Sequence, residues 1–159
     1  MATFYSPSEV VALAVETEKA GQLYYGLAAQ KTTAPRNREL LAFLADQEAE
    51  HQKAFAALYD KLEKAPAELP YNWDELVLYL QAITNSRFFL RADNAIALAG
   101  SAKDEREALD YAIQFEKETL LLYLEIERLV AEPFRAVVAG IAGQERQHIR
   151  LLAERRSGK

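Results

Sequence analysis

The chain contains two histidines, and each follows a glutamate at the same spacing. The segments QEAEH (47–51) and QERQH (144–148) both have the form Glu-x-x-His. Residues three positions apart lie on one face of a helix, so each pair directs a carboxylate and an imidazole the same way. Two such pairs on separate helices are what a di-metal site inside a helical bundle requires. The repeat therefore predicts a four-helix bundle built around two metal ions.

The composition favours an all-α fold, with residues 1–159 forming one domain. Half of the 159 residues are hydrophobic, and 6 glycines and 5 prolines leave few positions that break a helix. The absence of cysteine excludes disulfides, thiolate zinc sites and Cys-ligated iron within these residues. A net charge of -5 with no basic cluster argues against nucleic acid or an anionic membrane as a partner. The first residues do not resemble a signal peptide and no run reaches transmembrane length, so we expect a cytoplasmic protein.

Helix-start and helix-stop signals predict two helical hairpins, about 6–64 and 101–155, joined by a long crossover. We expect the long helices to begin near Ser6, Pro35, Ser101 and Pro133, with Gly100 ending the crossover and a frayed tail at 155–159. The crossover should hold one helix at about 74–82 and a shorter one. The inward-facing positions of the four helices are predicted as Val11, Ala14, Val15, Glu18, Gln22 and Tyr25; Leu41, Leu44, Glu48, His51, Phe55, Leu58 and Leu62; Leu109, Ala112, Ile113, Glu116, Leu120 and Tyr123; and Val137, Val138, Ile141, Glu145, His148 and Leu152.

The two hairpins resemble each other in sequence. Glu18-Lys19, followed by Tyr25, returns 98 residues later as Glu116-Lys117, followed by Tyr123. The two Glu-x-x-His pairs are 97 residues apart. This repeat predicts a pseudo-twofold axis, which would place the four inward glutamates around one central point.

Each long helix carries one glutamate on its otherwise apolar stripe: Glu18, Glu48, Glu116 and Glu145. A buried, unpaired carboxylate costs several kcal/mol, and these stripes carry no lysine or arginine to neutralise it. Two divalent cations would neutralise all four, and mixed oxygen and nitrogen ligands suit iron or manganese better than a closed zinc site. The alternative is that these glutamates are solvated and the histidines only fill the core.

Tyr25 and Tyr123 each stand two helical turns after an inward glutamate. Two interpretations remain open for them. Tyrosine on such a stripe commonly fills the core, and at this repeated spacing its hydroxyl can also reach a carboxylate that binds metal.

At these residues the chain resembles the rubrerythrin-type branch of the ferritin-like superfamily. The resemblance covers most of the chain and implies a ferritin-like bundle that binds two iron ions, with Glu48 and Glu145 bridging them. Carried over residue by residue, the implied ligands are Glu18, Glu48, His51, Glu116, Glu145 and His148. Manganese or mixed occupancy is the alternative metal content.

The chain departs from rubrerythrin proper in two ways. It has no cysteine for the four-cysteine rubredoxin module, so the resemblance implies an external electron donor such as a rubredoxin. It also has Thr119 where rubrerythrin proper has an extra glutamate. This second departure puts in question the ligand exchange that accompanies peroxide reduction in the family.

The function that the resemblance implies is reduction of hydrogen peroxide or dioxygen at the di-iron centre. A ferroxidase or iron-storage protein is the main alternative, and a non-enzymatic helical module with a structural metal site is a third. We also expect a homodimer that buries Tyr79, Phe88 and Phe89 of the crossover between subunits. An extended linker at residues 66–70 would permit exchange of the crossover or of a hairpin between chains.

Overall fold

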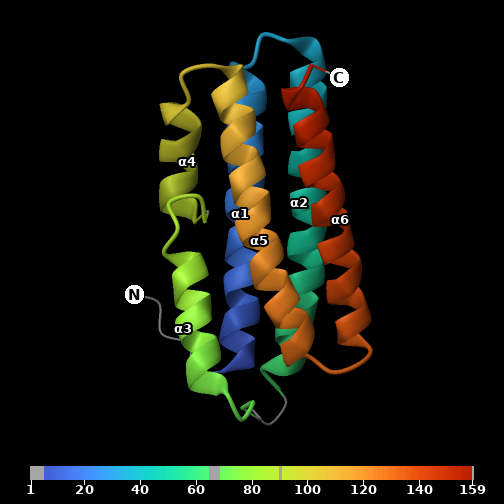
Figure 1. Ribbon diagram of the computed structural model, residues 1–159. Helices are drawn as coiled ribbons and strands as arrows, with labels where there is room; N and C mark the ends of the chain where they lie inside the picture. The colour runs from blue at the N-terminus through green and yellow to red at the C-terminus, as the bar shows by residue number, and fades with distance from the viewer. Residues whose placement is uncertain (1–5, 65–68, 90, 159) are drawn as a thin grey trace.

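The described residues of the computed structural model, 6–64, 69–89 and 91–158, form helices and no strands. Four long helices form a bundle, and two shorter helices lie end to end along one side of it (Figure 1). In chain order the helices are α1 (Pro7–Lys31), α2 (Pro35–Leu62), α3 (Trp73–Thr84), α4 (Ala92–Ser101), α5 (Glu105–Leu129) and α6 (Phe134–Arg156). The predicted all-α, ferritin-like bundle with short helices in its crossover is therefore confirmed.

The bundle is made of two antiparallel hairpins. Helix α1 packs along α2, and α5 packs along α6, while α1 and α5 join the hairpins to each other. The crossover helix α4 packs on α1, and α3 packs on α5, so the crossover covers one side of the bundle. No helix among the described residues is long and apolar enough to cross a membrane.

The apolar core forms two separate clusters along the bundle. One cluster draws on residues 10–14 of α1, 55–58 of α2, 122–126 of α5 with the following Val130, and 138–142 of α6. The other draws on residues 20–29, 41–44, 109–115 and 152 of the same helices. Between these segments, on every long helix, lie the buried polar residues Glu18, Glu48, His51, Glu116, Glu145 and His148. The fold therefore places these polar side chains in a layer across the middle of the bundle, with apolar packing on both sides.

Several local predictions were wrong. Helix α4 continues through Ser101, and α5 is instead capped by Asp104, whose carboxylate accepts a hydrogen bond of 2.7 Å from Glu107 N–H. Gln22 and Val137 are exposed rather than inward. Both lie at the margin of a predicted stripe, and the 3.6-residue period together with the crossing of the helices turns these margins toward solvent.

The last turn of α6 is ordered where we predicted a frayed tail. The helix runs through Arg156, whose guanidinium Nε lies 2.6 Å from the Asp110 carboxylate of α5. A second bond of 3.1 Å from its Nη2 makes this a bidentate pair. Such a pair fixes both side chains and holds the end of α6 against α5.

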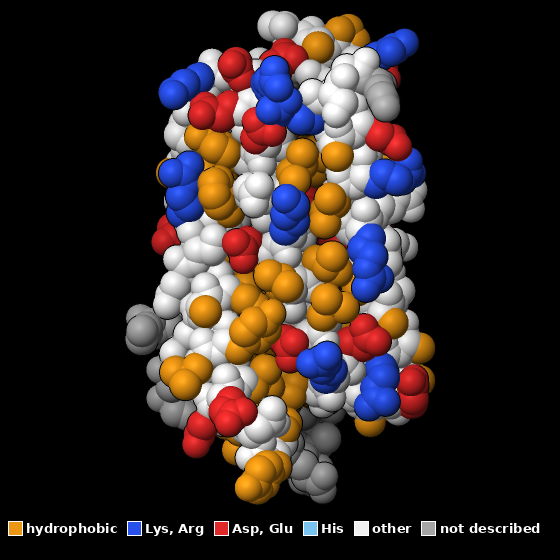
Figure 2. Space-filling model, viewed as in Figure 1, with side chains coloured by type: hydrophobic (Ala, Val, Ile, Leu, Met, Phe, Trp, Pro, Cys, Tyr) orange, Lys and Arg blue, Asp and Glu red, His pale blue; other side chains and the backbone are white. Residues whose placement is uncertain are grey.

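The predicted role of Phe89 in a subunit interface is also wrong. Phe89 is only 1% exposed, because it packs into the apolar core beside α3. Phe88 is half-buried, with its ring against Tyr111, whereas Tyr79 is 42% exposed. The homodimer itself stays a prediction, and most of the linker at 66–70 lies outside the described residues. Figure 2 shows that hydrophobic side chains also gather along the middle of the face that α5 presents.

A single glutamate ties the two hairpins together at one end of the bundle. Helix α2 begins after Ala34, which has no side chain able to cap the helix. The Glu105 carboxylate, at the start of α5, takes that place by accepting hydrogen bonds from the N–H groups of Thr33 (2.6 Å) and Ala34 (3.2 Å) and from the Asn37 amide (2.6 Å). The neighbouring Thr32 hydroxyl, and then these donors, lower the pKa of Glu105 to about 2. The cap of α2 is thus supplied by the other hairpin.

We predict that Glu105→Ala lowers the free energy of unfolding by about 1 to 2 kcal/mol, the cost of losing a helix cap. Because the native pKa of Glu105 is lowered, its contribution is present above pH 4.5 and is lost as the pH falls toward 2. Chemical denaturation at about pH 7 and about pH 3 measures both effects. Equal losses at the two pH values, or no loss at either, would contradict this account. Glu39→Ala, an exposed position near the start of α2, is the control for altered charge.

Candidate metal centre

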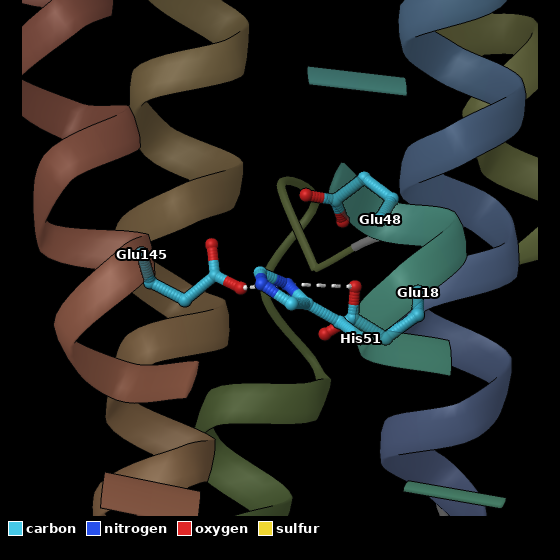
Figure 3. A group of neighbouring side chains, drawn as sticks. All are labelled: Glu18, Glu48, His51 and Glu145. Carbon is cyan, nitrogen blue, oxygen red and sulfur yellow. Dashed lines mark ion pairs between the residues drawn. The ribbon is translucent and has the colours of Figure 1, made fainter. Parts of the chain in front are cut away.

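The structure brings all six predicted ligand side chains together in the middle of the bundle. Glu18 comes from α1, Glu48 and His51 from α2, Glu116 from α5, and Glu145 and His148 from α6. The four glutamates are 0% exposed, and the histidines are 2 to 3% exposed. Figure 3 shows His51 between Glu145 on one side and Glu18 on the other, with Glu48 above it. The cluster thus draws on both hairpins, and neither hairpin alone completes it.

The donor atoms fall into two overlapping groups of metal-binding geometry. One group contains Glu18, Glu48, His51 and Glu145, and the other contains Glu48, Glu116, Glu145 and His148. Within each group, one donor atom from every residue lies within 4.8 Å of the others. Glu48 and Glu145 belong to both groups. Two carboxylates shared in this way are the arrangement of a di-metal site with bridging ligands.

Both imidazoles present Nδ1 to the carboxylates. His51 Nδ1 lies 2.8 Å from Glu145 Oε1 and 3.6 Å from Glu18 Oε2. His148 Nδ1 lies 3.0 Å from Glu145 Oε2 and 3.5 Å from Glu116 Oε1. The two rings stack, with centroids 5.5 Å apart and an interplanar angle of 21°. The imidazole nitrogens and carboxylate oxygens therefore converge on a shared centre, with Nδ1 as the metal-facing atom.

The outward nitrogens of the two histidines have different surroundings. His51 Nε2 lies 2.6 Å from Gln144 Oε1, so an N–H at Nε2 donates to the amide and leaves the Nδ1 lone pair for a metal. His148 Nε2 has no hydrogen-bond partner among the described residues, and the Phe43 ring meets its imidazole edge-on. Gln144 was not among the predicted site residues. A glutamine directly precedes both Glu-x-x-His segments, and this repeated position was the available signal.

Two tyrosine hydroxyls tie the hairpins together at the cluster. Tyr25 of α1 donates to Glu116 Oε1 of α5, and Tyr123 of α5 donates to Glu18 Oε1 of α1. Each hydroxyl therefore bonds the glutamate of the opposite helix rather than the one two turns before it. Both tyrosines are 0% exposed, and burial raises their pKa well above 10.0. They stay protonated and hold two carboxylates in fixed positions.

The unsatisfied atoms of this cluster fit a metal better than they fit a buried core. Both oxygens of Glu48 and one oxygen each of Glu18 and Glu116 are buried and accept no hydrogen bond from the described residues. Buried carboxylate oxygens are ordinarily satisfied, so four unsatisfied ones in a single cluster call for a cation. The side chains present therefore suit two metal ions.

Comparison with known proteins agrees with this geometry. The model of the rubrerythrin family matches residues 9–91, more than half of the 159-residue chain. The chain belongs to the rubrerythrin family. The matched part contains the first hairpin with its three candidate ligands. No curated protein matches this rubrerythrin-family chain.

A solved structure supports the fold over the whole length of this family member. It comes from Thermotoga maritima and is described as a ferritin-like di-iron carboxylate protein. The two chains are 22% identical, the alignment covers 99% of this chain and 98% of that one, and the TM-score is 0.68. The second hairpin, which the family model does not reach, therefore also has the ferritin-like arrangement.

In the apo form of this rubrerythrin-family protein, bound protons neutralise part of the negative charge of the four carboxylates. Burial, followed by neighbouring carboxylates, raises the pKa of Glu48 and Glu116 well above 4.5, and burial also raises the pKa of Glu18. Burial alone would lower the pKa of the histidines, but their carboxylate partners raise it to about 11 for His51 and about 9 for His148. The native apo protein thus holds more protons in this cluster than the unfolded chain does.

We predict that the stability of the apo protein falls as the pH rises from about 5 to about 8. The raised pKa values mean that the native state binds extra protons above pH 4.5 at the glutamates and above pH 6.5 at the histidines. Glu145 has a lowered pKa, and its contribution is lost only in stronger acid. Metal replaces the protons, so added metal should raise the melting temperature more at pH 8 than at pH 5. Equal stabilisation by metal at both pH values would show that the carboxylates do not converge.

We further predict that Gln144→Leu weakens metal binding by about ten- to a hundredfold, since it removes the group that orients His51. Equilibrium dialysis against ferrous iron, kept anaerobic, measures the affinity. Gln147→Leu, an exposed position one turn further along α6, is the matched control. An unchanged affinity in Gln144→Leu would remove the amide from the account of the site.

Proposed function

We propose that this protein binds two iron ions in the cluster and uses them to reduce hydrogen peroxide or dioxygen. The observation that carries the proposal is the sharing of Glu48 and Glu145 between the two ligand groups. Two separate structural metals would need no shared ligand, whereas metals that exchange electrons with one substrate must lie close together. Membership of the rubrerythrin family supports the same conclusion.

The donor set supports iron, with manganese as the alternative. Four carboxylates and two imidazoles supply oxygen and nitrogen ligands without any thiolate, which suits iron or manganese better than a closed zinc site. Two divalent ions also balance the four carboxylate charges, which the buried cluster requires. The related Thermotoga maritima protein is itself described as a di-iron carboxylate protein.

The chemistry proposed is a two-electron reduction. Two ferrous ions, when bound, supply the electrons that convert hydrogen peroxide and two protons into two water molecules. The chain excludes bulk water by burying all six ligands, and it fixes Glu18 and Glu116 through the tyrosine hydroxyls. Glu145 is oriented by both imidazoles. These contacts set the ligand positions before the substrate enters.

Repeated turnover requires electrons from outside this domain. The 159 residues contain no cysteine that could hold a rubredoxin-type iron. We infer a separate donor protein, such as a rubredoxin. Thr119 stands buried on α5, one turn after Glu116, where rubrerythrin proper has a further glutamate. Six ligands rather than seven are therefore proposed to carry the reaction.

The test loads the protein with ferrous iron without oxygen and adds hydrogen peroxide in limiting amounts. We expect two irons per chain and oxidation of two ferrous ions per peroxide, with turnover when a reductant is present. Iron content well above two per chain would instead support storage. Iron that peroxide does not oxidise would support the structural-metal alternative.

Variants of the shared carboxylates test the site separately from the activity. Glu48→Ala and Glu145→Ala should each remove most of both irons, because each carboxylate serves both ions. Elemental analysis of the purified proteins measures this. Glu50→Ala, an exposed position on α2, should keep two irons. Two irons in both of the first variants would overturn the assignment.

A further inference from the structure

Glu48 differs from the other three glutamates in how the protein holds it. Glu18 and Glu116 each accept a tyrosine hydroxyl, and Glu145 is paired with both imidazoles. Neither oxygen of Glu48 accepts a hydrogen bond from the described residues. Its Oε1 lies 3.7 Å from His148 Nδ1, which is beyond hydrogen-bond distance. In the protonated apo cluster its polar contact is the neighbouring Glu18 carboxyl, so its position depends on that contact and on the shape of its surroundings.

That shape is supplied by Gly21 of α1. A Cβ atom built on Gly21 would overlap Glu48 Oε2, and it would lie 2.8 Å from Cζ and 3.0 Å from Cε1 of the Phe115 ring. The Glu48 carboxylate thus lies directly against the bare backbone of α1, with the Phe115 ring beside it. Any side chain at position 21 would occupy the place of the carboxylate.

The other glycines of the four long helices do not have this role. A Cβ atom on Gly26, Gly140 or Gly143 would meet nothing within 4 Å. Glycine weakens a helix relative to alanine, so a buried glycine in the middle of α1 needs a compensating reason. The close approach of Glu48 is such a reason at Gly21, and only there among these four positions.

The space beside Gly21 that the Glu48 carboxylate fills, here called the slot, belongs to one half of the bundle only. The position 98 residues after Gly21, which matches it in the second hairpin, is Thr119. Thr119 is 0% exposed, so the equivalent place on α5 holds a buried side chain. The two halves therefore hold their shared carboxylates, Glu48 and Glu145, by different means.

We propose that Gly21 is a positioning residue for the metal centre: its missing side chain forms the slot that lets the Glu48 carboxylate reach the point shared by both ligand groups. This inference rests on the proposed di-metal site. Glu48, which no tyrosine hydroxyl or imidazole holds, is then the shared ligand whose orientation depends on packing and on the metals themselves.

The first test compares Gly21→Ala with Gly26→Ala, which adds the same methyl group to the same helix where space is open. Equilibrium dialysis with ferrous iron under anaerobic conditions measures the affinity and the number of metals bound. We expect Gly21→Ala to weaken binding at least about tenfold, as displacement of an oriented ligand does, and Gly26→Ala to bind as the wild type does. Binding by Gly21→Ala equal to that of the wild type would overturn the proposal.

The second test needs no metal and remains informative even when Gly21→Ala alone fails to fold. Thermal unfolding of the apo protein is compared for Gly21→Ala in the wild-type background and in the Glu48→Ala background. We expect the new methyl group to lower the melting temperature more when Glu48 is present than when residue 48 is alanine, where only the contact with the Phe115 ring remains. The same loss in both backgrounds would show that Glu48 does not occupy the slot, and the proposal would be wrong.

The two tests also separate this inference from the proposed function. Coupling between positions 21 and 48 in the apo protein, with no binding of two metals by the wild type, would overturn the di-metal function while the contact stood. Two metals bound equally well by the wild type and Gly21→Ala would leave the function intact and overturn only the role of Gly21.

Discussion

The structure depends on how four buried carboxylates are neutralised at one point. Ionised carboxylates facing one another inside a protein cost several kcal/mol each, and no lysine or arginine lies on the inward stripes to offset them. Protons on Glu48, Glu116 and the two histidines reduce this cost in the apo fold, as the direction of the pKa shifts shows. Metal ions remove it with the carboxylates ionised. Folding and metal binding are therefore linked through the same side chains.

The rest of the bundle offsets a polar layer that would otherwise destabilise it. Apolar clusters pack on both sides of the layer, and each long helix contributes to both of them. The tyrosine hydroxyls add bonds between α1 and α5 within the layer, so the hairpins are joined by polar contacts as well as by packing. The layer lies midway along the helices, and the apolar cluster on each side separates it from solvent.

The backbone follows the sequence repeat, but the side chains around the centre do not repeat fully. His51 Nε2 bonds Gln144, whereas His148 meets the Phe43 ring edge-on. Gly21 leaves a slot for Glu48, while its counterpart is the buried Thr119. The two ligand groups consequently have the same residue types and different surroundings. Differences of this kind give two metals in one symmetric frame unequal properties.

The sequence by itself determined the helical class, the two hairpins and the six polar residues of the central layer, because helical periodicity places Glu18 or a Glu-x-x-His pair on one face without help from distant residues. It did not determine the end of α4, since Ser101 and Asp104 are both residues that can cap a helix, nor the order in the last turn of α6, since Arg156 is held by Asp110 of another helix. Phe89 was predicted to lie in a subunit interface, but it is buried within the chain, because packing against α3 and the bundle covers it. The tertiary structure alone decided that the tyrosines bond across the bundle, that Gln144 holds His51, and that Gly21 admits Glu48. Each of these contacts depends on the spacing and the angle at which two helices meet, and the sequence around each residue does not specify either quantity.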